Sequence, residues 1–239
     1  MFDIVTVVFN DDDRLRSTLN SLQRIEFQGN IIIQDGSMLK TTIDLISRFP
    51  DLSIRHVRES DKGLYDAMNK AVKNVTSTHF LTLNCGDLLL NMPNNRTYSQ
   101  FDCAFFPVQV SFVNSQHIDF VPRISKIYSH MSVCHQGMII SRTFFSNLKG
   151  YDLKYGIAGD YDFVNRILLS SAQYTVHASE KPITLFEGDN GLSESRRFQL
   201  EMETAEIKVK YDHSGVLWSY SLHLLRYFKF KIYASFSLW

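Results

Sequence analysis

Short apolar segments alternate with amphipathic segments along the first third of the chain, and this alternation limits the fold more than any other feature. The apolar segments are residues 4–9, 30–34, 52–57 and 79–83. The first is an almost continuous apolar run rich in valine, which is typical of a strand buried on both faces of a parallel sheet. Helix-like segments separate them at 11–24, 41–49 and 64–71. The order β-α-β-α-β-α-β predicts an α/β fold with a parallel sheet and right-handed crossovers.

Polar residues end each of these four predicted strands. They are Asn10, Asp35, Asp61 with Lys62, and Asn84 with Asp87. The carboxyl ends of parallel strands meet at one edge of a sheet, and α/β proteins bind ligands there. We therefore expect these side chains to line a ligand site.

The segment 60–71 combines a turn at Asp61-Lys62-Gly63 with a short helix. Helical spacing gives this helix one apolar face and one polar face. The apolar face carries Leu64, Ala67, Met68 and Ala71, and the polar face carries Asp66, Asn69, Lys70 and Lys73. An ordinary surface helix has a similar charge count, but the position after a strand of the sheet predicts that the polar face lies toward the ligand edge.

The second half of the chain has a different pattern. Segments 101–113 and 118–124 alternate loosely and predict antiparallel strands, and further strands are expected at 138–140, 174–177 and 183–186. Helices are expected at 144–148, 160–170 and 194–211.

Composition narrows the class of protein. The 239 residues include 25 basic and 25 acidic side chains, and this balance argues against nucleic acid as a partner. Cys85, Cys103 and Cys134 are odd in number and widely spaced, which favours a reducing cytoplasm over a disulfide framework or a zinc site. The first residues lack the basic segment of a signal peptide, and no apolar run reaches the roughly 18 residues of a membrane-spanning helix.

Two carboxylates are candidates for chemistry. Asp87, delivered by the strand at 79–83, is suited to a Mg²⁺ ion shared with substrate phosphates, although Asn84-Cys85-Gly86-Asp87 is also ordinary turn chemistry. Asp160 opens a helix and is either its N-cap or a general base.

The order of motifs resembles the family 2 glycosyltransferases of the GT-A fold, and among them the colanic-acid type of bacterial polysaccharide enzymes. Residues 61–70 match the family block Asp-x-Gly-Ile-Tyr-Asp-Ala-Met-Asn-Lys nearly letter for letter. The other matching segments are Thr6-Val7-Val8-Phe9-Asn10, Leu83-Asn84-Cys85-Gly86-Asp87, His135-Gln136, Tyr151-Asp152, Gly159-Asp160-Tyr161-Asp162 and Asn190-Gly191-Leu192-Ser193.

The resemblance implies a Rossmann-like, mostly parallel central sheet with helices on both faces, and a role for each matching residue. Asp87 is expected to bind the divalent cation, Mg²⁺ or Mn²⁺, and Asp160 to deprotonate the acceptor hydroxyl. The residues implied to contact the nucleotide-diphosphate sugar donor are Thr6, Val7, Asn10, Asp35, Asp61, Lys62, Gly63, Asp66, Asn69, Lys70, Asn84 and Gly86. The acceptor-side residues are His135, Gln136 and Asp162.

The sequence departs from the family pattern at three points. Gln34, next to Asp35, stands where the family has its base-contacting Asp, Gly159 replaces a Glu, and the metal motif holds one carboxylate. Gln34 and the missing second carboxylate keep open a second hypothesis, an inactive nucleotide-sugar-binding or scaffolding relative. A nucleotidyltransferase is disfavoured because residues 10–13 are acidic and lack glycine.

The resemblance divides the chain into a glycosyltransferase domain at 1–212, with a donor half at 1–100 and an acceptor half at 101–212, and a segment at 213–239. After Asp212 the only formally charged side chains are Arg226, Lys229 and Lys231, among many aromatic residues. This mixture suits an anionic membrane surface. The alternative is a helix that packs on the catalytic domain or on a partner in a homodimer.

Together these expectations describe an inverting enzyme at the cytoplasmic face of the inner membrane. It would move a hexose or N-acetylhexosamine from a nucleotide sugar to a lipid-linked saccharide acceptor. The pathway expected is assembly of a bacterial surface polysaccharide such as O-antigen, capsule or exopolysaccharide.

Overall fold

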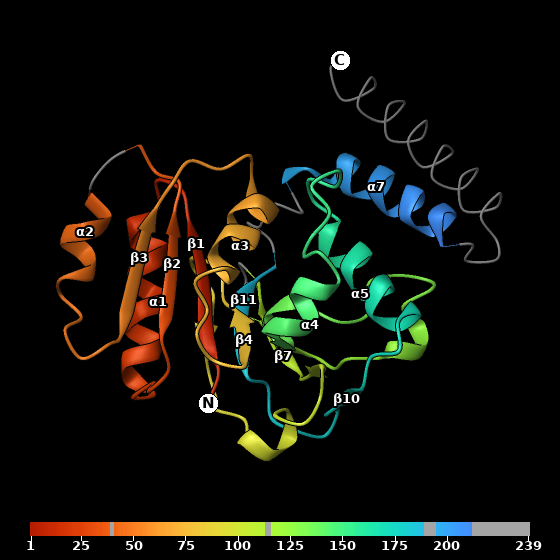
Figure 1. Cartoon of the computed structure of the whole chain (residues 1–239), viewed down its shortest axis with the longest axis horizontal. Helices are drawn as coiled ribbons and strands as arrows, with labels where there is room; N and C mark the ends of the chain where they lie inside the picture. Colours follow the sequence, from red (N-terminus) through yellow and green to blue (C-terminus); the bar gives the residue numbers. More distant parts are fainter. Residues whose placement is uncertain (39–40, 113–115, 189–194, 212–239) are drawn as a thin grey trace.

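The structure, a computed structural model, describes residues 1–38, 41–112, 116–188 and 195–211 (Figure 1). Its first half contains β1 (Asp3–Val8), α1 (Asp12–Arg24), β2 (Ile31–Asp35), α2 (Thr41–Ile46), β3 (Ile54–Arg58), α3 (Leu64–Val72), β4 (His79–Thr82) and β5 (Leu88–Leu89). Its second half contains β6 (Cys103–Phe105), β7 (Val108–Ser111), β8 (His117–Phe120), β9 (Met138–Ser141), α4 (Arg142–Asn147), α5 (Gly159–Leu169), β10 (Tyr174–Val176), β11 (Thr184–Glu187) and α7 (Arg197–Lys210).

A seven-stranded sheet with the order β10-β6-β9-β4-β1-β2-β3 forms the centre of the molecule. Strands β4, β1, β2 and β3 are parallel to one another, as the alternating pattern predicts. Strand β9 runs antiparallel between β4 and β6, so strands from both halves of the chain share one sheet. The expected α/β fold with a mostly parallel central sheet is confirmed.

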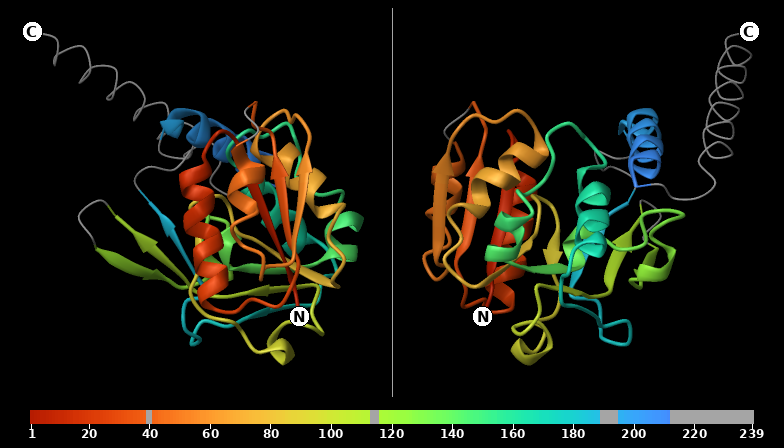
Figure 2. Two further views of the ribbon diagram at one scale, coloured as in Figure 1. Left: turned by 90° about the vertical axis from the view of Figure 1, so that its left-hand side faces the viewer. Right: turned by 45° about the vertical axis from the view of Figure 1, so that its right-hand side comes forward.

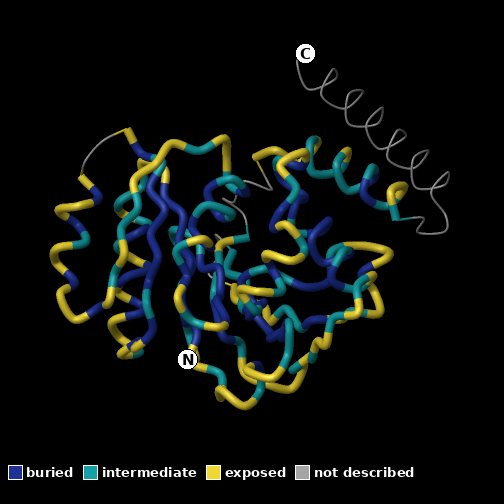
Figure 3. The backbone as a smooth tube through the Cα atoms, in the orientation of Figure 1, coloured by how far each residue is buried: buried dark blue, intermediate teal, exposed yellow. Residues whose placement is uncertain are grey.

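Both faces of the sheet are covered by helices, which explains the continuous apolar runs. On β1, Ile4 and Val8 point to the side of α1, whereas Val5 and Val7 pack with the side chains of α3. Strand side chains alternate between faces, so a strand buried on both sides must be apolar at nearly every position. Figure 3 shows this burial as dark blue in the central strands, with yellow on the outer helices and loops.

The expected strand at 101–113 is wrong as a single element. It is two strands, β6 and β7, which belong to different sheets and are separated by Phe106 and Pro107. Proline has no N–H to donate to a ladder, and here its carbonyl instead accepts a hydrogen bond from the Ile183 N–H at 3.0 Å. Strand β8 also stops early, at Phe120, and residues 124–126 form a 3₁₀ turn (η2).

Strands β5, β11, β7 and β8 form the second sheet. The β7–β8 hairpin is antiparallel, as expected, and it extends away from the main sheet (Figure 2). Helix α7 packs beside α5 on the side of the molecule opposite β3 (Figure 1).

The proposed membrane segment at 213–239 and the motif at 190–193 lie outside the described residues. Within the described ranges, no helix combines the length and the apolar character needed to cross a bilayer.

Candidate active site

A pocket of about 530 Å³ opens at the carboxyl ends of β1, β2 and β3, the edge at which the sequence predicts a ligand site. Its lining comes from the loops that follow these strands: Phe9, Asp35, Gly36, Ser37, Met38, Arg58, Glu59, Ser60 and Asp61. We call it the donor pocket. Two of the predicted donor residues, Asp35 and Asp61, line it directly.

Asp35 is fully buried and has two oriented hydrogen bonds. Its Oδ1 accepts from the Ser37 N–H at 2.8 Å, and its Oδ2 lies 2.9 Å from Nε2 of His56. Burial alone would raise the pKa of Asp35, but the hydrogen bonds from Ser37 and His56 outweigh burial and hold it below its ordinary value. Gln34 does not line the pocket, and its amide donates to the Glu59 carbonyl at 3.2 Å. Asp35 therefore lines the pocket, and its sequence neighbour Gln34 does not.

Asp61 is held over Gly36. Its Oδ1 accepts from the Gly63 N–H at 2.9 Å, and a Cβ at Gly36 would overlap its Oδ2. Gly36 therefore allows the Asp61 carboxylate to approach the pocket wall closely. Asn10 holds the same wall in place, because its N–H donates to Ser37 Oγ at 2.8 Å and its Oδ1 accepts from the Met38 N–H at 3.1 Å.

The polar face of α3 supports the loop that lines the pocket. Asp66 Oδ2 accepts from the Lys62 N–H at 2.9 Å, and Lys70 Nζ donates to the Ser60 carbonyl at 2.7 Å. Lys70 also lies 3.0 Å from Glu59 Oε1. Asp66 and Lys70 thus contact the backbone of the loop and do not line the pocket, so their contact with the donor stays a prediction.

Three other predicted donor residues are engaged inside the fold. Asn69 donates to the Tyr151 carbonyl and accepts from the Tyr151 N–H, both at 2.9 Å, which ties α3 to the acceptor half. Thr6 Oγ1 donates to the Leu83 carbonyl at 2.8 Å, and Val7 packs in the core. Thr6 and Val7 thus lie within the sheet rather than at the pocket.

The turn after β4 delivers Asp87. The Asn84 N–H donates to Asp87 Oδ2 at 3.1 Å, and Thr18 of α1 accepts from the Gly86 N–H and donates to the Asp87 carbonyl, both at 2.9 Å. Burial raises the pKa of the Asp87 carboxyl to about 7, with the charge of His135 acting in the opposite direction. A metal cation that binds in place of the proton would stabilise the charged form of such a buried carboxylate.

His135 joins this turn to the acceptor half. Its Nε2 lies 3.1 Å from Nδ2 of Asn84, and its Nδ1 lies 3.4 Å from Oδ2 of Asp160. Because the Asn84 amide nitrogen can only donate, this assignment makes Nε2 the acceptor and places the proton of a neutral ring on Nδ1, toward Asp160. Gln136, also predicted from the motif, is buried beside it, and its carbonyl accepts from Thr184 Oγ1 at 2.9 Å.

Asp160 lies in the first turn of α5 and is not its N-cap, which is Ala158. The N-cap alternative is therefore wrong. Asp160 Oδ1 accepts from the Tyr161 N–H at 2.8 Å and lies 3.2 Å from the phenol oxygen of Tyr65, while among the described residues Oδ2 has only the longer contact, 3.4 Å, with His135. The side chain is 21% exposed, so Oδ2 can meet a substrate.

Tyr65 was missed among the candidate residues. It is 4% exposed, its hydroxyl also contacts the Ile157 carbonyl at 2.7 Å, and burial raises its pKa well above the ordinary value, so it remains a donor. A Cβ at Gly159 would lie 2.7 Å from Cε2 of its ring. This close approach gives a physical reason for glycine where the family has a glutamate. The signal was present in the sequence, because Tyr65 shares a helical face with Met68 and Val72.

Asp162, expected on the acceptor side, has a structural role instead. Its Oδ2 accepts from Arg166 Nε, and its Oδ1 accepts from Lys210 Nζ and from the hydroxyl of Tyr211, each at 2.8 Å. Its side chain is fully buried; Oδ1 binds α5 to the end of α7, and Oδ2 is taken by Arg166 within α5. It therefore has no oxygen left to bind an acceptor.

The oxygens near Asp87 fit a hard cation that substrate completes. Among the described residues there is no group of three or more His, Cys, Asp or Glu side chains placed to hold a metal ion. Oδ1 of Asn84, however, is buried without a hydrogen-bond partner among the described residues, and the backbone N–H of the same residue bonds the Asp87 carboxylate. Mg²⁺ commonly binds through one or two protein oxygens, with waters and substrate phosphates supplying the rest.

Comparisons with known proteins bear on the family and the fold of this chain. Residues 3–89 match the model of glycosyl transferase family 2. A PGL/p-HBAD biosynthesis glycosyltransferase of Mycobacterium tuberculosis is 27% identical over 187 residues, which cover 73% of this chain and 72% of the relative.

Solved structures share the fold at low identity. S. aureus TarS superposes with a TM-score of 0.64 at 15% identity over 95% of this chain, which spans 43% of the length of TarS. A shorter TarS structure in complex with UDP-GlcNAc gives 0.63 at 15% identity, covering 95% of this chain and 72% of that one. A mannosyltransferase from Pyrobaculum calidifontis in complex with GDP-Man and Mn²⁺ gives 0.60 at 12% identity, covering 89% and 64%. Residues 3–89 therefore match glycosyl transferase family 2, as the motifs in this part of the chain predict, and the solved structures share the GT-A fold of the chain.

Proposed function

We propose that the protein is an inverting, metal-dependent glycosyltransferase. It transfers a hexose or N-acetylhexosamine from a nucleotide-diphosphate sugar to a lipid-linked saccharide during assembly of a bacterial surface polysaccharide. One observation carries the proposal: Asp87 and Asp160, from different halves of the chain, are linked through Asn84 and His135 at the sheet edge that also forms the donor pocket. Supporting it, similar folds have been solved with UDP-GlcNAc and with GDP-Man and Mn²⁺.

The donor half binds and orients the nucleotide sugar. Asp35 and Asp61 line the pocket with oriented carboxylates, and Arg58 lines it with a guanidinium group. Asp87 and Asn84 would hold Mg²⁺ or Mn²⁺, which when bound supplies Lewis-acid stabilisation of the leaving diphosphate.

The acceptor half supplies the base. Asp160 Oδ1 is held by the Tyr161 N–H and by Tyr65, so the less engaged Oδ2 is the oxygen that receives the acceptor hydroxyl proton. The His135 ring, with its proton on Nδ1, stabilises that carboxylate until the proton arrives. As the anomeric carbon passes through an oxocarbenium-like state, attack from the side opposite the leaving group inverts its configuration.

A second candidate function is nucleotide-sugar binding without transfer. The single carboxylate at the metal motif and Gln34, where the family has its base-contacting Asp, favour it. Transfer or hydrolysis of a nucleotide sugar by the purified protein would exclude this alternative.

A thermal-shift panel tests donor binding. UDP, GDP and their sugars are added to the full chain with Mg²⁺, with Mn²⁺ or with EDTA. A ligand at a hundredfold excess over its Kd stabilises by about 2.7 kcal/mol, or about 5 to 10 °C in Tm for a chain of this size. We expect one nucleotide sugar to give such a shift only with the cation. A panel without any shift would overturn the proposal, and a shift without the cation would overturn its metal dependence.

A further inference from the structure

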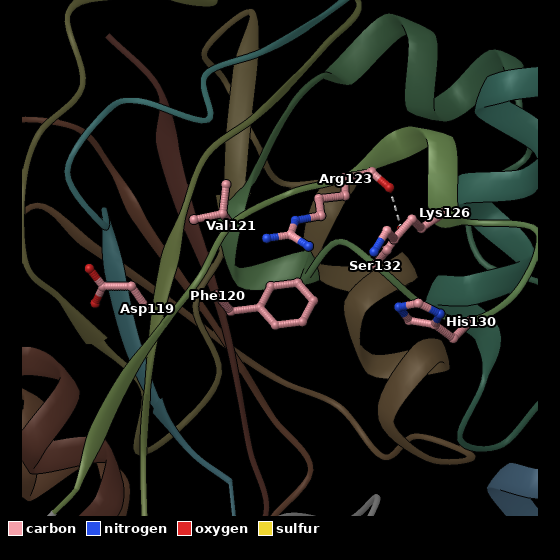
Figure 4. Close-up of a pocket in the computed structure, with 7 residues that line it drawn as sticks. All are labelled: Asp119, Phe120, Val121, Arg123, Lys126, His130 and Ser132. Carbon is pink, nitrogen blue, oxygen red and sulfur yellow. Dashed lines mark hydrogen bonds between the residues drawn. The ribbon is translucent and has the colours of Figure 1, made fainter.

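A second cavity of about 250 Å³ lies in the acceptor half, where β8 ends and the following loop turns back (Figure 4). It is lined by Asp119, Phe120, Val121, Arg123, Lys126, His130 and Ser132. We call it the basic pocket. It shares no residue with the donor pocket.

The basic pocket gathers cations that the described part of the chain leaves unpaired. Arg123 and Lys126 are permanently charged, His130 can become so, and no side chain among the described residues forms an ion pair with them. The one carboxylate of the lining, Asp119, accepts instead from Gln109 Nε2 at 3.0 Å. Figure 4 shows Asp119 across the pocket from the three basic side chains, beyond the ring of Phe120.

Some of the other basic residues are paired. Arg166 binds the buried carboxylate of Asp162, and Lys70 lies between Glu59 and Asp66. In the basic pocket, by contrast, two or three cations lie over one cavity without a carboxylate partner among the described residues, which favours an anionic ligand.

The loop that carries these cations is held in place without a ligand. The Arg123 N–H donates to the Ser132 carbonyl at 2.9 Å, and Ser132 Oγ donates to the Arg123 carbonyl at 2.7 Å. Ile127 is fully buried, and its carbonyl accepts from the Tyr161 hydroxyl at 2.8 Å. A pre-formed loop lowers the entropy lost on binding.

We infer that the basic pocket binds a phosphate group of the acceptor. A guanidinium fork with an ammonium and an imidazole matches the charge and oxygen count of a phosphate or diphosphate better than that of a single carboxylate. Phe120 and Val121 add an apolar wall for the group attached to the phosphate.

The same loop connects the pocket to the proposed chemistry. Ser132 precedes His135 by three residues, and Tyr161, which holds Ile127, follows Asp160 directly. The assignment to the acceptor rests on the proposed function, whereas phosphate binding itself does not.

Histidine NMR of the full chain separates the two pockets. His130 reports on the basic pocket, and His56, bonded to Asp35, reports on the donor pocket. The two signals are assigned with His130→Gln and His56→Gln. Inorganic pyrophosphate is titrated without divalent cations, and we expect the His130 signal to shift in a saturable manner.

The Arg123→Ala/Lys126→Ala variant should weaken pyrophosphate affinity at His130 at least tenfold. The matched control is Arg48→Ala/Lys181→Ala, which removes the same two charges from exposed positions outside both pockets and should bind as the wild type does. Equal affinity in the two double variants, or a shift at His56 alone, would overturn the inference. The thermal shift with nucleotide sugars, measured on the same variants, reports separately on the donor pocket.

A vesicle arm identifies the source of the phosphate. The two double variants are sedimented with vesicles of phosphatidylcholine alone or mixed with phosphatidylglycerol. Weaker binding of Arg123→Ala/Lys126→Ala to both pyrophosphate and the anionic vesicles assigns the pocket to a lipid headgroup. Weaker binding to pyrophosphate alone assigns it to a phosphate-bearing ligand outside the bilayer. If the two double variants differed in binding to vesicles but not in binding to pyrophosphate, the inference would be overturned, because the difference would then reflect surface charge alone.

Discussion

The phenol oxygen of Tyr65 lies 3.2 Å from Oδ1 of Asp160, although 95 positions separate the two residues in the chain. Tyr65 belongs to the helix that supports the donor-pocket loop, and Asp160 belongs to the helix that carries the proposed base. The contact therefore connects the two halves at the point where donor and acceptor must meet.

Removal of the Tyr65 hydroxyl should slow catalysis without weakening donor binding. In Tyr65→Phe, Asp160 loses one of the groups that orient it, so we expect kcat to fall about tenfold, or about 1.4 kcal/mol of barrier. The KM for the donor should be unchanged. The Ile157 carbonyl also loses its partner, which should lower stability by about 1 to 2 kcal/mol.

Tyr155→Phe is the matched control, because the Tyr155 hydroxyl is buried and has no hydrogen-bond partner in the part of the chain that the structure describes. It should leave kcat unchanged. Steady-state kinetics and urea unfolding check both variants. An equal loss of kcat in the two variants would contradict the role of Tyr65.

Asp160→Asn should stop transfer and keep nucleotide binding. Loss of a general base lowers the rate about 10²- to 10⁴-fold. Nucleotide binding should persist because the donor pocket shares no residue with α5. The measurements are product formation with radiolabelled donor and the thermal shift with the same nucleotide sugar. Wild-type turnover in this variant would refute the assignment of the base.

Asp162 should control stability in a pH-dependent way. Burial alone would raise the pKa of its carboxyl, but hydrogen bonds from Lys210, Tyr211 and Arg166 hold it below the ordinary value. A carboxyl whose pKa is lowered in the folded state stabilises the protein above its unfolded pKa of about 3.9 and loses that contribution as the pH falls through the folded pKa.

Asp162→Asn should therefore lower the free energy of unfolding by about 3 kcal/mol at pH 7, and the difference from wild type should shrink below about pH 4. Asp152→Asn is the control, since its carboxylate is 42% exposed and 3.9 Å from Lys210. This control should lower the free energy of unfolding by less than about 1 kcal/mol. Denaturant unfolding between pH 3 and 7 measures both. A difference independent of pH would contradict the carboxylate's role.

The basic residues of segment 213–239 should decide membrane association. Each basic residue near an anionic surface contributes about 1 kcal/mol, so replacing Arg226, Lys229 and Lys231 by Gln should reduce vesicle partitioning about a hundredfold. Deletion of 213–239 should abolish it. Vesicle sedimentation measures this, and retention of the nucleotide-sugar thermal shift shows that the domain remains folded. Undiminished partitioning of the deletion would refute the proposal.

Local patterns account for much of the fold. The valine-rich run at residues 4–9 predicts a strand buried on both faces, and strand β1 is one, because nearly every position must be apolar when helices cover both sides. The same reasoning predicts the donor-pocket edge, because polar residues end each of the first strands. It fails at 101–113, where apolar alternation continues through Phe106 and Pro107 although the chain changes sheets there.

The sequence by itself determined the parallel half of the sheet, the pocket edge and the resemblance to family 2 glycosyltransferases. These depend on the spacing of apolar residues, on the order of the segments and on motifs of adjacent residues. Only the tertiary structure decided the partners of each side chain. Asp162 and Asp160 lie in the same turn of α5, yet one is closed off by Lys210 and Tyr211 and the other faces Tyr65 and His135. Those partners come from distant segments, and no local pattern records which distant group a side chain will meet.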